Sequence, residues 1–561
     1  MIGRRPFVLW LGGGMLALCI ASAADRLAHG SELLFNHPGG FCDSAFSLAL
    51  TTAADKATIY YTTNGDEPLP GKAKRYVGPI IIGTTTIVRA AVFDSATNLV
   101  DSMARTFLFV PDVINQTGSA FPQTWGSSAG KPVPAYYHLT TAMETNATTR
   151  PSVATALRSL PTFSIIGTPA DFFSPETGIY SHPMERGRDW ERGVSLEMFD
   201  ADGKLTFQCA CGLRIHGGTS RQPDVSPKHS FRILFKKRYG TARLDYPLFG
   251  PEGVQRFNTL ILRAGNNDSW LARPGEGGRR ADYLRDEWMR RSMQAMGHPS
   301  ARGYFVHLYL NGLYWGIYDL CETPGSDLLP ADNEDAAAGY DVRKGDKIEA
   351  GDAVAWNQII TLANAGLNDD RRYQEISRFL DLPELVDYLI LNFYAGNSDW
   401  DRSANWVAIR PHTPGGRFQF LVWDGECTLG NVAADTLGFD DDDSPPHLFH
   451  KLSENPAFRK LFARRAQQLL FRNGLLSPEA AADRYRALAN SLAPSIAAEA
   501  ARWGAYGKYL NGYRNTVSAY TIEKDWKPEV ERIQIRYFLR RGDVVAAQFR
   551  ENGLLHDSMN H

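Results

Sequence analysis

Alternating apolar and polar residues predict an all-β module near the start of the chain, in residues 30–110. Residues 57–62 alternate and run into the turn signal Asn64-Gly65. Residues 76–82 and 86–93 have the composition of further strands. Short strands at intervals of about ten residues are typical of a β-sandwich. We therefore expect an independent sandwich here, with no catalytic residues of its own.

A linker rich in Gly, Ser, Thr and Pro is expected over residues 111–160, with at most one short strand or helix. Beyond Pro161 the pattern predicts a strand-rich half. Asn311-Gly312 is its strongest local signal, because this pair between two apolar runs favours a type I′ hairpin. A helix is expected over residues 282–296. The predicted strands are 194–198, 205–210, 211–216, 228–236, 257–262, 305–310 and 313–320.

The second half of the chain is predicted to be mostly helical, because apolar residues recur there with the helical period. A sheet-rich half followed by a helical half indicates the α+β class, in a layout of two lobes. We place a main domain at residues 161–445 and its C-terminal helical extension at residues 446–561. The expected helices are 354–365, 370–380, 383–394, 447–472, 478–503 and 528–549.

The N-terminus has the features of a secretory signal peptide, residues 1–23. Arg4 and Arg5 precede an apolar run that ends in the small-residue site Ala21-Ser22-Ala23. Cys19 raises the alternative of a lipoprotein, but Leu18 stands where that signal needs a small residue. No later apolar run reaches the ~20 residues that span a bilayer. The mature protein is therefore expected to be secreted or extracytoplasmic, without a transmembrane span.

Composition, net charge and cysteine count exclude several classes of protein and partner. The chain has 561 residues, of which 43% are hydrophobic and 22% charged, so general disorder is excluded. A formal net charge of −2 gives no electrostatic reason to expect nucleic acid as a partner. Without the signal peptide five cysteines remain, and at most one or two disulfides are plausible. Cys209 and Cys211 are too closely spaced to predict a zinc site.

The stretch from Gly396 to Gly430 concentrates candidate chemistry. Asp399 and Asp401 lie close to Asn405, and a predicted hairpin leads from there to Asp424 and Glu426. Carboxylate and amide oxygens in this order can hold a divalent cation beside a general base, as in kinases. The alternative is an ordinary surface hairpin with acidic ends.

Several separate motifs, in the right order, resemble those of the CotH family, the spore-coat protein H kinases. The similarity spans about Pro161 to Gly430. It implies a compact variation on the protein-kinase fold and transfer of phosphate from ATP to proteins. The motifs are Arg214–Arg221 (RIHGGTSR), Pro227–Phe231 (PKHSF), Leu284-Arg285-Asp286, Asn311–Gly316 (NGLYWG) with Glu322, and Trp423-Asp424. The sandwich is similar to the immunoglobulin-like domain at the C-terminus of chitobiase-type enzymes, through Thr58–Pro68 (TIYYTTNGDEP) and Tyr76.

The resemblance implies a nucleotide-binding role for four residues. Lys228 stands where the family has a lysine that contacts nucleotide phosphates. Arg214 and Arg221 bracket the Gly217-Gly218 turn, whose backbone can approach a phosphate. Glu322 is a candidate partner for Lys228, as in kinase Lys–Glu pairs, with a capping or surface position as the alternative.

The resemblance also assigns the acidic residues. Asp399 matches the catalytic base, while Asn405 and Asp424 match ligands of Mg²⁺ or Mn²⁺. Kinases separate the catalytic Asp and Asn by about five positions. Asn405 lies six positions after Asp399 and four after Asp401, so Asp401 remains an alternative base. Glu426 stands where many members have a second Asp, and a longer carboxylate can still bind metal.

Two functions from different classes follow. The first is ATP-dependent phosphorylation of Ser or Thr in surface or extracellular proteins, and the presence of the complete acid set favours it. The second is a catalytically silent surface or matrix protein on the same scaffold, whose sandwich binds a glycan or another partner. A glycosidase is suggested only by the accessory module and lacks an acid pair of its own.

Overall fold

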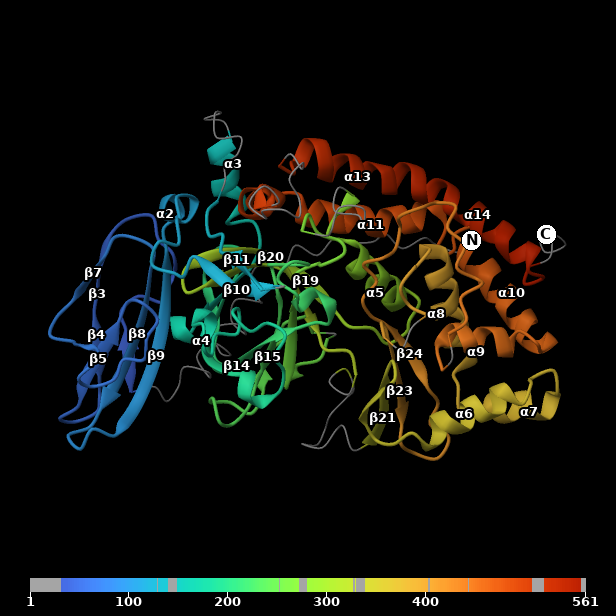
Figure 1. Ribbon diagram of the computed structural model, residues 1–561, viewed down its shortest axis with the longest axis horizontal. Helices are drawn as coiled ribbons and strands as arrows, with labels where there is room; N and C mark the ends of the chain where they lie inside the picture. Colours follow the sequence, from blue (N-terminus) through green and yellow to red (C-terminus); the bar gives the residue numbers. More distant parts are fainter. Residues whose placement is uncertain are drawn as a thin grey trace, which may run out of the picture.

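The structure is a computed structural model that describes residues 32–555 except 129, 140–148, 252, 272–279, 326–327, 329–338, 402–403, 442 and 507–518. The predicted signal peptide lies outside these residues. Figure 1 shows a β-sandwich at one end, a barrel in the middle, and a small sheet with most of the helices at the other end. The α+β class, with a β-rich N-terminal region and C-terminal helices, is confirmed.

The N-terminal module contains a five-stranded sheet in the order β2-β9-β8-β5-β6 and the strand pairs β1-β4 and β3-β7. Its core consists of alternate residues that point inward, among them Val88, Ala90 and Val92. The strands are β1 Leu33–Phe35, β2 Gly40–Phe41, β3 Phe46–Leu48, β4 Leu50–Thr52, β5 Thr58–Thr62, β6 Lys74–Arg75, β7 Ile80–Ile82, β8 Thr86–Phe93 and β9 Leu99–Leu108.

The segment expected to be a linker is packed against the barrel. It contains α2 (Val110–Ile114), the hairpin β10–β11 (Thr124–Ser128 and Lys131–Pro134) and α3 (Thr149–Ala156). Trp125 is buried within 5.6 Å of the Trp315 ring of the barrel, measured between ring centroids. The segment therefore contains more secondary structure than the one short strand or helix expected, because a few buried aromatic side chains outweigh the Gly- and Ser-rich composition around them.

The central element is a closed barrel with the strand order β12-β13-β14-β15-β18-β20-β19. Alternate residues such as Ile215, Phe231 and Leu262 fill its interior. The Asn311-Gly312 hairpin is confirmed, since both residues have positive φ, 48° and 79°, as a type I′ turn requires. The strands are β12 Thr162–Ile166, β13 Arg192–Phe199, β14 Leu205–His216, β15 Ser230–Leu234, β18 Thr259–Arg263, β19 Gly303–Leu310 and β20 Leu313–Glu322. The pair β16–β17 (Leu244–Asp245 and Arg256–Phe257) and α4 (Pro169–Phe173) lie outside it.

A four-stranded sheet, in the order β22-β21-β23-β24, packs beside the barrel. Its hairpin of β23 (Trp406–Pro411) and β24 (Gln419–Val422) was predicted. The strands β21 (Tyr340–Lys344) and β22 (Lys347–Ala350) were not. They carry many charged residues, so they lack an apolar signal.

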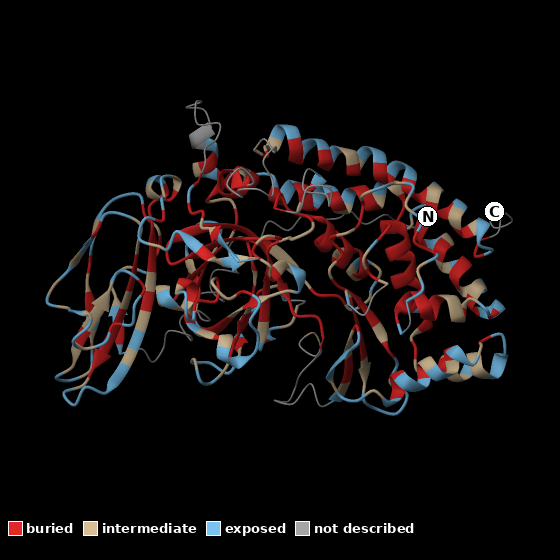
Figure 2. Ribbon diagram, viewed as in Figure 1, coloured by how far each residue is buried: buried red, intermediate tan, exposed pale blue. Residues whose placement is uncertain are grey.

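The helices follow the predicted order, but the long C-terminal segments are divided or interrupted. Segment 447–472 divides at Asn455-Pro456, segment 478–503 divides near Ser495, and segment 528–549 contains a π-helical stretch over residues 533–537. Figure 2 shows α8 buried along nearly its whole length, whereas one side of α14 is exposed. The bounds are α5 Arg285–Ala295, α6 Val354–Asn364, α7 Asp370–Ile376, α8 Leu382–Ala395, α9 Pro445–Leu452, α10 Pro456–Leu470, α11 Pro478–Leu492, α12 Ile496–Trp503, α13 Lys527–Arg532 and α14 Phe538–Glu551.

The described residues also bear on the predictions about membrane spans and disulfides. None of the helices described has the length and apolar character needed to cross a bilayer. Cys42, Cys209, Cys211, Cys321 and Cys427 are all free thiols, so the disulfides considered plausible are not formed among them.

Candidate active site

The site is built around the turn that follows β24, where Asp424 and Glu426 meet the guanidinium of Arg263. Arg263 Nη2 lies 2.6 Å from Asp424 Oδ1 and 2.6 Å from Glu426 Oε1. Asp424 has a φ of 63°, a left-handed conformation that Asp tolerates better than most residues and that recurs at functional sites. Its side chain is 37% exposed, whereas that of Glu426 is buried. Asp424 is therefore the acid that faces solvent.

A third acid, Asp286 on helix α5, completes this cluster. Arg263 Nε lies 3.3 Å from Asp286 Oδ2, and Asp286 Oδ1 accepts a hydrogen bond of 2.7 Å from the Gly425 amide. Burial alone would raise the pKa of Asp286, but Arg263 and Arg290 lower it. For Glu426, burial and the neighbouring carboxylates outweigh Arg263 and raise its pKa to about 7. One buried cation thus holds three carboxylates together.

The loop that carries Asp399 is attached to the same turn. Ser398 N donates to Cys427 O over 3.1 Å, and Leu429 N donates to Ala395 O over 2.8 Å. Asn405, at the start of β23, donates from Nδ2 to Asp399 O over 2.8 Å. Its φ of 65° makes it a second left-handed residue at the site. The two predicted segments, 399–405 and 424–426, therefore come together.

The pKa of Cys427 also indicates that Asp399 lies close to Asp424 and Glu426. Desolvation is the main cause that raises the pKa of its thiol to about 12, and the carboxylates of Asp399, Glu426 and Asp424 raise it further. Asp399 is partly exposed. Asp401, the alternative base, is also partly exposed.

The Lys228 ammonium is bonded to groups other than the acids of this site. It is buried at the base of the barrel, and its Nζ donates to Glu499 Oε1 over 2.7 Å and to the backbone oxygen of Ile317. The predicted pairing with Glu322 is wrong: Glu322 Oε2 instead accepts from the Arg302 amide over 2.7 Å. Because Lys228 has no exposed surface and an internal counter-ion, its position does not support contact with a nucleotide phosphate.

The two arginines that bracket the Gly-Gly turn also donate hydrogen bonds to protein groups. Arg221 is buried and donates to the backbone oxygens of Gly217, Pro183, Glu185 and Ile215. Arg214 donates from Nε to Glu191 over 2.8 Å. Burial would raise the pKa of Glu191, but hydrogen bonds from Lys236, Arg238 and Tyr239 and the charge of Arg214 lower it to about 2. Both arginines hold the barrel rim together in this structure.

Comparison with protein families identifies the domain. The model of the family described as CotH kinase protein matches residues 213–543, more than half of the chain. The chain belongs to the CotH kinase family. The family model of the chitobiase/beta-hexosaminidase C-terminal domain matches residues 37–103. No curated protein matches the chain.

The CotH match extends beyond the region of similarity expected from sequence and includes the C-terminal helices, for which the structure gives a reason. Arg541 on α14 is buried and donates to the backbone oxygens of Tyr394, Val432 and Ala434. Arg532 donates to Leu429 O over 2.6 Å. The C-terminal helices therefore hold the backbone next to both segments that carry the site acids, the one with Asp399 and the one with Asp424 and Glu426.

The donor set of the CotH site fits a hard divalent cation. Carboxylate oxygens of Asp424 and Glu426 and the amide oxygen of Asn405 are the ligand types that Mg²⁺ and Mn²⁺ take. Asn405 donates through Nδ2, which leaves its Oδ1 as the atom suited to a metal.

The sequence predicted no role for Arg263 or Asp286, although Asp286 belongs to the CotH-like motif Leu284-Arg285-Asp286. Alternation in β18 offered a partial signal: Leu260 and Leu262 point into the barrel, so Arg263 must point out of it. Its partners lie 23 to 163 positions away, so sequence alone could not identify them.

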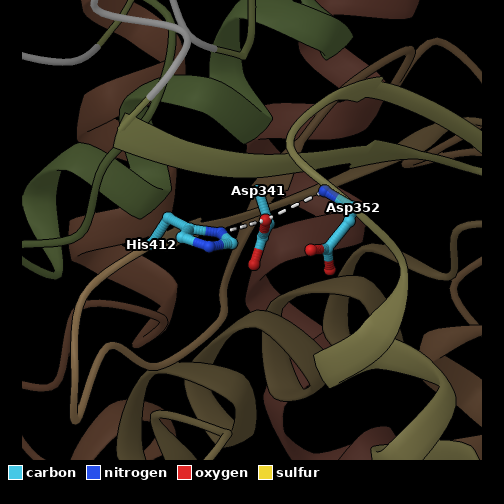
Figure 3. Close-up of side chains that lie close together, drawn as sticks. All are labelled: Asp341, Asp352 and His412. Carbon is cyan, nitrogen blue, oxygen red and sulfur yellow. Dashed lines mark hydrogen bonds and ion pairs between the residues drawn. The ribbon is translucent and has the colours of Figure 1, made fainter.

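A second cluster with metal-ligand residue types lies on the small sheet, where Asp341 is flanked by Asp352 and His412 (Figure 3). Asp341 Oδ1 accepts 2.8 Å from His412 Nδ1 and 3.1 Å from the Asp352 amide, and Oδ2 accepts from Arg410. Burial would raise the pKa of Asp341, but these hydrogen bonds lower it. These hydrogen bonds join β21 to the loops that carry Asp352 and His412, and we assign the cluster no metal.

A cleft of about 510 Å³ lies between the sandwich and the barrel. Its walls include Arg89 and Arg238, which are bonded to Glu67 and Glu191. It contains none of the predicted site residues.

Proposed function

We propose that this protein is an atypical kinase that transfers the γ-phosphate of ATP to Ser or Thr hydroxyls of surface or extracellular proteins, with Mg²⁺ or Mn²⁺. The observation that supports it most is the convergence of Asp399 and Asn405 with Asp424 and Glu426 across two hydrogen-bonded loops. Membership of the CotH kinase family supports the same reaction class. Export rests on the N-terminal sequence.

In this proposal Asp399 orients the acceptor hydroxyl and accepts its proton. The acceptor oxygen forms a bond to the γ-phosphorus as the bond from that phosphorus to the bridging oxygen breaks, and ADP leaves. Asn405, Asp424 and Glu426 would hold the divalent cation, which would neutralise charge on the phosphates. Arg263 positions Asp424 and Glu426 through its ion pairs.

We further propose that the barrel and the helical part act as the two lobes of a kinase. Arg263 on β18 and Asp286 on α5 form a strand-to-helix pair of cation and carboxylate. Protein kinases use a comparable Lys–Glu pair between a strand and the helix αC. The acids of the turn after β24 lie beside this pair.

The second candidate is a catalytically silent surface protein on the same scaffold, with the sandwich as the binding module for a glycan or other partner. The contacts of Lys228, Arg214 and Arg221 favour it, because these three cations, assigned to the nucleotide by resemblance, are bound to protein groups.

Phosphate transfer separates the two candidates. Purified mature protein is incubated with γ-labelled ATP and Mg²⁺ or Mn²⁺, alone and with a general Ser/Thr protein acceptor. We expect label on Ser or Thr that Asp424→Ala and Asp399→Asn abolish and that Asp441→Ala, an exposed loop acid, retains.

Two results would revise this proposal. If Asp401→Asn abolished transfer and Asp399→Asn did not, the base would be Asp401. Absence of transfer, together with no shift of the unfolding temperature by ATP and metal, would favour the silent scaffold.

A further inference from the structure

The outer face of the barrel near Asp424 carries basic residues on neighbouring strands. Ile215 on β14, and Phe231 and Ile233 on β15, point into the barrel, so His216 and Arg232 point outward. Arg232 is paired in register with Ile261 on β18, two positions before Arg263. Three basic side chains thus share one surface.

The small sheet brings a fourth basic side chain, that of Lys344, to this surface. Val342 on β21 packs with Ile261 and Cys321 of the barrel. Since side chains alternate along a strand, Lys344 points to the same side as Val342, toward the barrel. Figure 1 shows β21 and β23 side by side in this sheet.

Lys344 lies beside the metal-binding turn without being neutralised. Its Nζ is 5.1 Å from the centroid of the Trp423 ring, and the Arg263 guanidinium is 4.6 Å from the same ring. Within the described part of the chain, no hydrogen bond or ion pair of the Lys344 side chain is found, whereas its backbone is paired in the sheet. Its side chain is partly exposed. Lys228, by contrast, is sealed against Glu499.

Titration behaviour agrees with an excess of positive charge. Desolvation is the main cause that lowers the pKa of Lys344; Glu349 and Asp424 oppose it, and Arg232 and Arg263 add to it. Desolvation, Arg232, Lys344 and Arg263 also lower the pKa of His216 well below its ordinary value. Arg263 is paired with three carboxylates, whereas Glu349 and Asp424 act on Lys344 only through their charge.

We propose that Lys344 is the lysine that binds the phosphate chain of the nucleotide, in the place that sequence resemblance gave to Lys228. A partly exposed ammonium next to Asp424 can contact non-bridging phosphate oxygens while Asp424 holds their metal ion. The Trp423 ring holds the ammonium beside Asp424 through a cation–π contact. This assignment rests on the proposed function, because it identifies the phosphate contact of that same site.

The test compares binding of Mg²⁺ complexes of ATP and of inorganic tripolyphosphate, with adenosine as the probe that lacks phosphate. Calorimetry is done on the full mature chain and on Lys344→Met, Lys344→Arg and Lys237→Met. Lys237 is an exposed lysine after β15 and serves as the matched control. Unfolding temperatures of all four proteins establish that the fold is intact.

We expect Lys344→Met to weaken ATP and tripolyphosphate by at least about tenfold, the size of one charge-assisted contact. Adenosine affinity should not change, Lys344→Arg should recover part of the loss, and Lys237→Met should bind like the wild type. Equal binding of ATP by wild type and Lys344→Met would overturn the assignment while leaving the kinase proposal intact. Wild-type binding of neither phosphate compound would overturn it too. Tripolyphosphate binding that depends on Lys344, without phosphate transfer, would support the subsite and contradict the kinase.

Discussion

At the scale of residues, Lys228 and Lys344 are lysines in opposite environments. Lys228 is fully enclosed and paired with Glu499, while Lys344 is partly exposed and rests on an aromatic ring. Only Lys344 has side-chain surface that a ligand can reach. The resemblance placed Lys228 correctly in a motif. It could not show that a helix 271 positions later supplies the counter-ion.

Lys228→Met should destabilise the fold by about 3 kcal/mol or more, because it leaves the buried Glu499 carboxylate without its cation. The double variant Lys228→Met/Glu499→Gln should lose less, since it removes the unpaired charge and keeps an acceptor for the Ile317 amide. Chemical denaturation measures both. A Lys228→Met protein of wild-type stability whose only defect is ATP affinity would contradict the structural role.

At the scale of elements, local signals predicted most of the fold. The Asn311-Gly312 hairpin and α8 were identified because turn chemistry and helical period act within a few residues. Strands β21 and β22 were missed, because few of their residues are buried and β23, the partner of β21, lies some 60 positions away in sequence. The acids of the site were predicted; Arg263, which gathers them, was not.

One element contact offers a sharp test of docking between the barrel and α12. Gly316 on β20 has a φ of 118°, and a Cβ there would lie 2.7 Å from Glu499 Oε2 and 2.7 Å from Trp503 Nε1. Gly316→Ala should therefore lower the unfolding temperature markedly. Gly415, with a φ of 81° and nothing within 4 Å, is the matched control for backbone strain alone. Equal losses for the two alanine variants would mean that the helix contact is not tight.

At the scale of the whole molecule, the sandwich is joined to the barrel through buried polar groups. Glu197 on β13 accepts from the Thr106 amide over 2.9 Å, and Thr106 Oγ1 lies 2.7 Å from Ser164 Oγ. Glu197, Thr106 and Ser164 are all fully buried. The sequence predicted the two modules but no contact between them, since long-range polar pairs leave no local pattern.

This junction should make stability depend on pH. Burial raises the pKa of Glu197 from 4.5 to about 7, although Arg105 and Thr106 oppose the shift. A carboxyl with a raised folded-state pKa favours folding when protonated, so its contribution is full below pH 4.5 and is lost as the pH rises to about 7. Glu197→Gln should therefore gain unfolding temperature relative to wild type between pH 5 and pH 8. Glu176→Gln, on an exposed turn, should show no such trend; a flat difference for Glu197→Gln would contradict the account.

The central claim is that Asp424 holds a metal–nucleotide complex, and electron paramagnetic resonance of Mn²⁺ measures this directly. Mn²⁺ with ATP is titrated with the wild-type chain, Asp424→Ala and Asp441→Ala, and the spectrum of the bound ion is followed. We predict a protein-bound Mn²⁺–ATP spectrum for wild type and Asp441→Ala, and the spectrum of free Mn²⁺–ATP for Asp424→Ala. A bound spectrum that persists unchanged in Asp424→Ala would contradict the assignment of the site.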